Sequence, residues 1–384
     1  MTRDMSPTAT ASLTRYPYID ALRGVAILGV VAVHTSQAVA PANEALTFAM
    51  KQGANCVQLF FVVSAVALCL SWEARTPFDR EFAARNFWIR RFARIAPMFY
   101  LAALFHLAVD GLQPRFWAPD GVTPLAIPLS AVFAHGFHPN TINAIVPGGW
   151  SIAAEAMFYV VFPLLFGCAR KIAVLLLLLS LSIAVYALNK VALGGWLVTF
   201  YPTSQSYMVV AFTSMNFLGL APVFVMGVMT FVIVSRRQAG ERIAMAAAGV
   251  LCGLGIAVAI AGRPVVNMLL HPLAWGVWFG LLVIVVARWQ PVMVVNPFVE
   301  WLGKISYSMY FLHFVVLDFS ARLRLQPDGP PDNLASLLFF LAVVAITALL
   351  SAATYRWIEQ PGIEMGRRLV ARLNSARVPA ASSR

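Results

Sequence analysis

Two ionisable residues in one apolar stretch are the first candidates for chemistry. Residues 21–38 are apolar enough to cross a membrane, yet they include Arg23 near the start and His34 near the end. An ionisable side chain within a span costs about 2.5–3.5 kcal/mol on insertion scales, so one that is kept usually has a partner or a function. Arg23 can extend its guanidinium group to the membrane interface. His34 lies three helical turns deeper, where its imidazole could act as a general base or as a structural, hydrogen-bonded group.

Glu155 is the carboxylate of a second apolar segment, 150–168. A carboxylate at such a position has to be protonated, paired or exposed to a water-filled cavity. We therefore expect Glu155 to face the same cavity as His34, where it could orient the imidazole or stabilise its charged form. Trp150 and Tyr159 flank this carboxylate, and both also fit the aromatic belt at a membrane interface.

Arg91 and Arg94 close the most basic loop of the chain. Residues three apart share one face of a helix, so two guanidinium groups would lie together at the membrane edge, with Arg23 as a third cation at the same face. Such a cluster suits a phosphate-bearing ligand. The alternative interpretation is a basic cluster that determines topology and attracts anionic lipid headgroups.

Other polar residues in apolar segments are candidates for lining the same site. Tyr310 and His313 share one helical face, whereas small polar residues in spans often serve only helix packing. His135 and His138 lack a clear third ligand, so the sequence predicts no metal site. The further site-lining candidates are Ser64, Trp150, Ser151, Tyr159, Tyr310 and His313.

The elements that position these residues are predicted to be membrane helices. The chain of 384 residues is 60% hydrophobic and only 11% charged, against about 45–50% and 25% in soluble proteins. The composition therefore predicts an all-α, polytopic membrane bundle of about ten transmembrane helices. The expected spans are 21–38, 55–72, 94–110, 150–168, 172–189, 211–234, 243–261, 266–287, 305–320 and 335–355, and 122–135 is a re-entrant segment, an interfacial segment or an eleventh span.

The distribution of positive charge predicts the orientation of the bundle. Most of the 28 Lys and Arg residues fall in loops on one side, which places both termini in the cytoplasm. The expected organisation is an N-terminal tail (1–17), a transmembrane domain (18–361) and a basic C-terminal tail (362–384). Because topology explains the net charge of +12, nucleic-acid binding is not expected.

An ordered set of short motifs resembles the acyltransferase 3 family of integral membrane acyltransferases. The set covers residues 18–361 and departs from the family at Ala65, where the family usually has Gly. The motifs are Asp20 to Gly24 with His34 downstream, Phe60 to Ser64, Arg91 to Pro97, Trp150 to Tyr159, Ser306 to His313, and Glu359 to Pro361.

This resemblance implies a multi-pass protein of the bacterial cytoplasmic (inner) membrane that transfers an acyl group, often acetyl, from cytoplasmic acyl-coenzyme A. The implied acceptor is a hydroxyl of a cell-surface or secreted glycan, glycolipid or related molecule. The residue chemistry agrees with this reaction. His34 and Glu155 are the expected catalytic residues, and Arg23, Arg91 and Arg94 suit the phosphates of the donor.

Several alternatives stay open on the sequence alone. A transporter or flippase with a His34–Glu155 proton relay is the competing function. Base catalysis by His34 and a transient acyl-histidine are both compatible with the motifs, as are acetyl and longer acyl groups. No motif specifies the acceptor or the oligomeric state.

Overall fold

The computed structural model describes residues 15–168, 171–235, 242–243, 245–251, 271–326 and 330–375. Within these ranges the regular elements are helices, with one isolated β-bridge between Arg115 and Ala118. Both expected tails extend beyond the described residues. The longer helices are α1 (Pro17–Ala38), α3 (Cys56–Asp79), α4 (Ala83–Asp110), α6 (Gly149–Cys168), α7 (Ile172–Leu188), α9 (Ser206–Met215), α10 (Phe217–Ser235), α12 (His271–Trp289), α13 (Pro297–Arg322), α14 (Asn333–Thr354) and α15 (Gln360–Ser375).

Eight helical segments among the described residues are long and apolar enough to cross a membrane. They coincide with eight of the ten spans predicted from the sequence. The predicted span 305–320 is helical, within α13, but its serines, tyrosines and His313 make it less apolar than the other eight. The predicted span 243–261 lies mostly outside the described residues.

The segment 122–135 does not span a membrane. It forms only the six-residue helix α5 (Ala126–Ala131) and turns. Six residues rise about 9 Å, whereas a hydrocarbon core is about 30 Å thick. Of the three possibilities that the sequence allowed for this segment, an eleventh span is therefore excluded.

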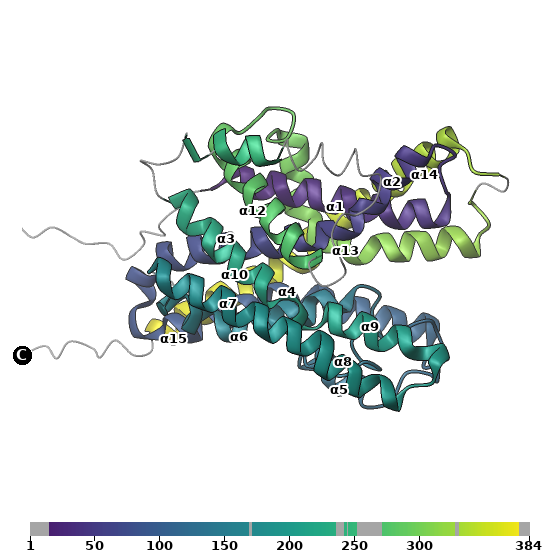
Figure 1. The fold of residues 1–384 in the computed structure, drawn as a ribbon, viewed down its shortest axis with the longest axis horizontal. Coiled ribbons are helices and arrows are strands. Elements are labelled where there is room, and N and C mark those ends of the chain that lie inside the picture. The colour runs from purple at the N-terminus through teal and green to yellow at the C-terminus, as the bar shows by residue number, and fades with distance from the viewer. Residues whose placement is uncertain are drawn as a thin grey trace, which may run out of the picture.

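Helices α1 and α13 pack closely against each other. In Figure 1, α1, α12 and α14 lie above, α6–α9 lie below, and α3, α4, α10 and α13 lie between them. Two glycines allow the backbones of α1 and α13 to touch: a Cβ atom on Gly303 would lie 1.7 Å from the carbonyl oxygen of Asp20, and one on Gly24 would lie 2.1 Å from that of Val299. Since His34 contacts His313 further along, the two helices run in the same direction.

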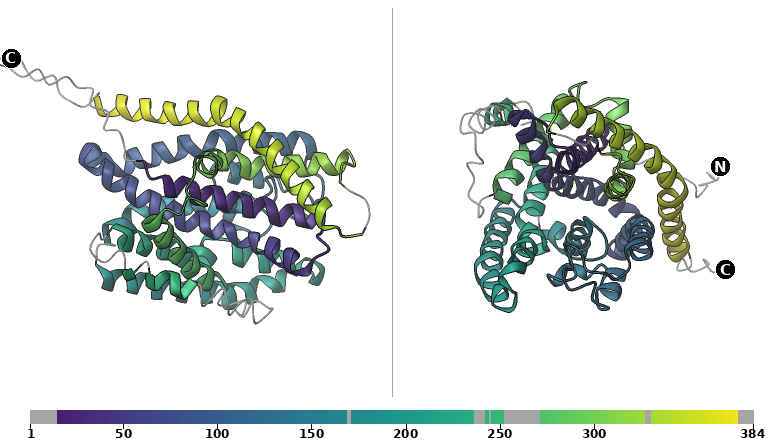
Figure 2. Two further views of the ribbon diagram at one scale, coloured as in Figure 1. Left: turned by 90° about the horizontal axis from the view of Figure 1, so that it is seen from above. Right: turned by 90° about the vertical axis from the view of Figure 1, so that its right-hand side faces the viewer.

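Helix α15 supports the part of α4 that carries the candidate arginines. The chain leaves α14 through a π-helical turn, Tyr355–Glu359, and α15 then follows one side of the bundle (Figure 2). Gly362 and Gly366 of α15 pack directly against Ala93 of α4.

A buried ion pair fixes the same region of α4. Arg90 pairs with Asp79 at the end of α3, and their side chains are only 16% and 8% exposed. Asn86, also on α4, donates a hydrogen bond to the same carboxylate. Together with the packing of α15, these contacts hold the first half of α4 against the bundle.

Candidate active site

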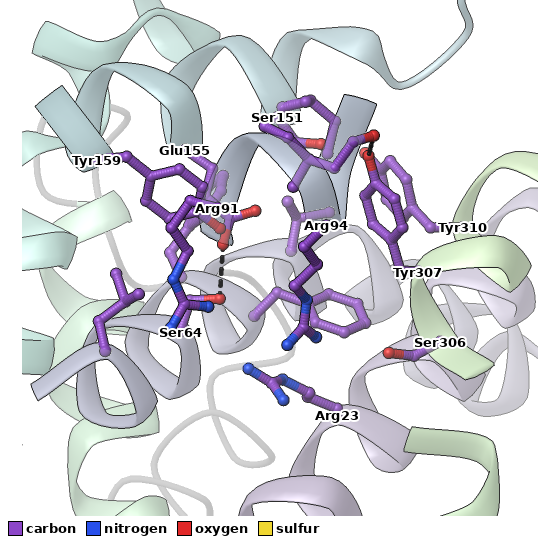
Figure 3. Close-up of a pocket in the computed structure, with 16 residues that line it drawn as sticks. Arg23, Ser64, Arg91, Arg94, Ser151, Glu155, Tyr159, Ser306, Tyr307 and Tyr310 are labelled. Atoms are coloured by element: carbon purple, nitrogen blue, oxygen red, sulfur yellow. Dashed lines mark hydrogen bonds between the residues drawn. The ribbon is translucent and has the colours of Figure 1, made fainter. Parts of the chain in front are cut away.

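A pocket lies between α1, α3, α4, α6 and α13, and encloses about 680 Å³ of empty space, part of it open to solvent. Figure 3 shows its polar side chains converging from these five helices. Eight of the eleven site residues predicted from the sequence line this pocket. They are Arg23, Ser64, Arg91, Arg94, Ser151, Glu155, Tyr159 and Tyr310.

Three guanidinium groups dominate the pocket. Arg23 comes from α1, and Arg91 and Arg94 come from α4. In Figure 3 the guanidinium groups of Arg23 and Arg94 point toward one another. Arg91 lies over the rings of Phe87 and Tyr159, with its guanidinium carbon 5.5 and 5.8 Å from their centroids. Because like charges in a partly buried site repel, a bound anion would stabilise this arrangement.

Glu155 lines the same pocket and partly offsets the charge of the arginines. Its carboxylate accepts a hydrogen bond of 2.8 Å from the Ser64 hydroxyl (Figure 3), and it interacts electrostatically with Arg23 and Arg91. Among the described residues, the three guanidinium groups make no ion pair within 4 Å and no hydrogen bond. One carboxylate against three cations leaves the pocket with a net positive charge.

His34 lies elsewhere on α1 and does not line the pocket. Its Nδ1 atom is 3.1 Å from the Oε1 atom of Gln37. Its ring centroid is 5.3 Å from that of His313 and 4.7 Å from that of Phe314. Eleven residues of helix separate it from Arg23, which corresponds to about 16 Å.

The structure therefore separates two groups of predicted site residues. Glu155 lies with the arginines, and His34 lies with His313. Tyr310 links the two groups, because it lines the pocket and its ring centroid is 6.0 Å from that of His313. No contact joins Glu155 to His34 among the described residues, contrary to the expectation that both face one cavity.

The start of α6 meets α13 at a glycine with a left-handed backbone conformation. Gly148 has a positive φ of 78°, a conformation that glycine adopts most easily. Its carbonyl oxygen accepts hydrogen bonds from Tyr310 (3.1 Å) and Ser151 (3.0 Å), so it holds both hydroxyl groups at the edge of the pocket. Trp150 does not line the pocket and packs on Phe61 instead, with ring centroids 6.2 Å apart.

The histidines of the connection before α6 are not arranged as metal ligands. His135 is buried, stacks on Phe99 and contacts the carbonyl oxygen of Gly149 through Nε2 at 3.0 Å. Burial lowers the pKa of its imidazole, which favours the neutral ring. The part of the chain that the structure describes holds no group of three His, Cys, Asp or Glu residues able to bind a metal.

Sequence analysis missed several residues near the site. Ser306 and Tyr307 line the pocket, and helical periodicity could have found them because they lie about one turn before Tyr310. Gln37 contacts His34, and its position three residues later on the same helix was the available signal.

The chain was compared with known proteins. The family model described as an acyltransferase domain matches residues 16–356. Acyltransferase MdmB of Streptomyces mycarofaciens is 32% identical over 172 residues, which are 42% of this chain and 42% of that protein. Peptidoglycan O-acetyltransferase OatA of Listeria monocytogenes is 27% identical over 180 residues, or 41% of this chain and 25% of that protein. In these matches the chain spans less than half of the length of either relative. No solved structure matches it.

Proposed function

We propose, from the premise that the chain belongs to the acyltransferase domain family, that this membrane O-acyltransferase uses acyl-coenzyme A as its donor. The acyl group is acetyl in the simplest case. The acceptor is a hydroxyl of a cell-surface or secreted glycan, glycolipid or related molecule. Among the relatives, OatA is named for acetylation of peptidoglycan, which is an acceptor of this class.

The observation that carries the proposal is the arginine pocket. Arg23, Arg91 and Arg94 converge there without an ion pair within 4 Å among the described residues, and one carboxylate only partly offsets their charge. Guanidinium groups bind phosphate through paired, charge-assisted hydrogen bonds. A donor that carries several phosphates would supply the anion that this cluster calls for.

The distance between the arginines and His34 suits a long donor. The nucleotide end of coenzyme A is too polar to enter a membrane core, whereas its pantetheine arm is thin and extended. With the phosphates on the arginines, the arm would run past Tyr310 toward His34, about 16 Å further along α1. The thioester would then lie close to the imidazole.

The chemistry proposed for His34 is general-base catalysis. The imidazole removes the proton of the acceptor hydroxyl, and the oxygen attacks the thioester carbonyl. The new carbon–oxygen bond forms as the carbon–sulfur bond breaks, and coenzyme A leaves as a thiol after taking the proton from His34.

The orientation proposed from the charge distribution completes this arrangement. With both termini in the cytoplasm of a bacterium, the arginines face the cytoplasmic acyl-coenzyme A pool. His34 then lies past the middle of the inner membrane, closer to an acceptor on the outer side. The acyl group alone would cross between the two sides.

A transporter with a His34–Glu155 proton relay has weaker support. Such a relay needs the two side chains in contact or joined by water. Glu155 instead interacts with Ser64 and the arginines, and His34 contacts Gln37 and His313.

Two measurements on the purified protein test the proposed function. We expect the wild type to bind acetyl-coenzyme A in calorimetry, and to release coenzyme A thiol when a hydroxyl acceptor such as a methyl hexoside or water is present. A folded protein that neither binds acetyl-coenzyme A nor releases thiol from it would refute this donor.

A further inference from the structure

His313 is a buried histidine that the proposed chemistry does not yet use. Its side chain is fully buried in α13, with an exposed fraction of 0%. Its ring centroid lies 5.3 Å from that of His34, and the two rings are tilted by 33°. The two imidazoles are therefore direct neighbours, whereas no charged side chain contacts either ring among the described residues.

The hydrogen bond of His313 defines its tautomer. Its Nδ1 atom lies 3.0 Å from the carbonyl oxygen of Met309. A carbonyl oxygen only accepts, so Nδ1 carries the hydrogen, and Nε2 of the neutral ring carries a lone pair. This Nε2 atom is buried and has no hydrogen-bond partner among the described residues. Because most buried polar atoms have a partner, this lone pair is available to a donor that forms during the reaction.

His34 becomes such a donor when it takes a proton. Its Nδ1 atom faces the amide oxygen of Gln37 at 3.1 Å, so Nδ1 carries the hydrogen and Nε2 is free to act as the base. After protonation both ring nitrogens are donors. One N–H remains on Gln37. The other, which carries the proton taken from the acceptor, can turn toward the unpartnered Nε2 atom of His313, because the centroids of the two rings lie 5.3 Å apart.

We infer that His313 is a positioning residue that accepts a hydrogen bond from His34 once His34 holds the proton of the acceptor hydroxyl. The contact forms directly, after a small rotation of the ring, or through one water molecule. The inference rests on the proposed function. The sequence suggested Glu155 for this role, but Glu155 lies in the arginine pocket.

The proton balance of the step is simple. The acceptor hydroxyl loses its proton to His34, and its oxygen forms the ester bond as the carbon–sulfur bond breaks. The departing thiolate then takes the proton from His34. His313 stays neutral throughout, and it contributes only a hydrogen bond that is charge-assisted while His34 is cationic.

This contact affects turnover more than binding. It is absent while both rings are neutral and forms once His34 has taken the acceptor proton, so it stabilises the cationic state of His34 that occurs during turnover and not the ground state with bound donor. Its loss should lower kcat and leave the KM for the donor unchanged. A purely structural histidine would not produce this separation.

The test compares His313→Phe and His313→Gln with His106→Gln as a control. His106 is another buried histidine, which contacts Asp110 on α4 and neither lines the pocket nor contacts His34. Thiol release from acetyl-coenzyme A is measured with water and with a methyl hexoside as acceptors. The affinity for acetyl-coenzyme A is measured on the same samples, and it also reports that each variant is folded.

We expect His313→Phe to lower kcat by about 10- to 10²-fold, the effect of losing a charge-assisted hydrogen bond. KM and donor affinity stay at the wild-type values. His313→Gln keeps an acceptor oxygen in the side chain and recovers part of kcat, and His106→Gln behaves as wild type.

Two results would overturn the inference while the proposed function stands. One is a wild-type kcat in His313→Phe, whether or not His313→Gln also keeps the wild-type kcat. The other is an equal loss of kcat and donor affinity in both variants, which would make His313 structural. If the wild type itself neither binds acetyl-coenzyme A nor releases thiol, the proposed function fails, and the inference fails with it.

Discussion

Replacing Arg94 or Arg91 by alanine should weaken donor binding strongly. Both side chains line the pocket from one face of α4, and neither forms an ion pair within 4 Å among the described residues. A charge-assisted hydrogen bond to phosphate contributes about 1.5–3 kcal/mol. Each substitution should therefore raise the Kd for acetyl-coenzyme A by about 10- to 150-fold. Lysine should recover only part of this loss, because it lacks the two-pronged geometry of guanidinium.

The same substitution should have the opposite effect on the stability of the empty protein. Arg94 lies beside Arg23 and Arg91, and the repulsion between these like charges destabilises the folded protein when no donor is bound. We expect Arg94→Ala without donor to unfold at a temperature equal to or above that of the wild type. Donor should raise the unfolding midpoint of the wild type far more than that of the variant.

Calorimetric titration of acetyl-coenzyme A into the purified variants is the deciding assay. Arg368→Ala is a matched control, because Arg368 is an exposed arginine of α15 that pairs with Glu364 outside the pocket. Wild-type affinity in both Arg91→Ala and Arg94→Ala would refute the donor site. An equal loss in Arg368→Ala would indicate a general charge effect instead of phosphate binding.

Further predictions concern catalysis, charge and packing. His34→Ala should lower the rate of thiol release by about 10²–10⁴-fold with donor affinity retained, and lost affinity in calorimetry would contradict the separation of the two sites. Glu155→Gln should tighten donor binding by roughly 1 kcal/mol, or about fivefold, and retain more activity than His34→Ala; weaker binding would argue against a net positive pocket. Gly303→Ala should lower the unfolding midpoint by the equivalent of about 1–3 kcal/mol. Gly167→Ala should not, because a Cβ atom there would meet no other atom of the described residues within 4 Å. Asp79→Ala should cost about 3–5 kcal/mol of stability because it leaves Arg90 buried without its partner, and an unchanged unfolding midpoint would show that the pair contributes little.

The sequence predicted how far along each helix the site residues lie, but not which neighbours they face. Apolar length identified most spans, and the spacing of Arg91 and Arg94 correctly indicated one helical face. The prediction that His34 and Glu155 face each other depended on how α1 and α6 are rotated about their axes. The position of each residue along its own helix does not determine that rotation. That rotation depends on the packing of α1 against α13, where Gly303 lets the backbones touch.

The segment 122–135 shows a second limit of sequence patterns. Its apolar run is compatible with a membrane segment, yet only Ala126–Ala131 is helical. Proline lacks a backbone N–H and restricts the residue before it, so Pro124 and Pro128 shorten the helix. Composition averaged over a window does not register this effect.

The π-helical turn between α14 and α15 sets the phase of the last helix. A π-turn accommodates one extra residue in a helix, and each residue rotates an α-helix by about 100°. Deleting one residue within Tyr355–Glu359 would restore a regular helix, but it would turn Gly362 and Gly366 away from α4. The extra residue thus rotates α15 about its axis by about 100° relative to a continuous α-helix. It brings the glycine side of α15 to the helix that carries Arg91 and Arg94, so a change in register some distance from the pocket would alter how the pocket is supported.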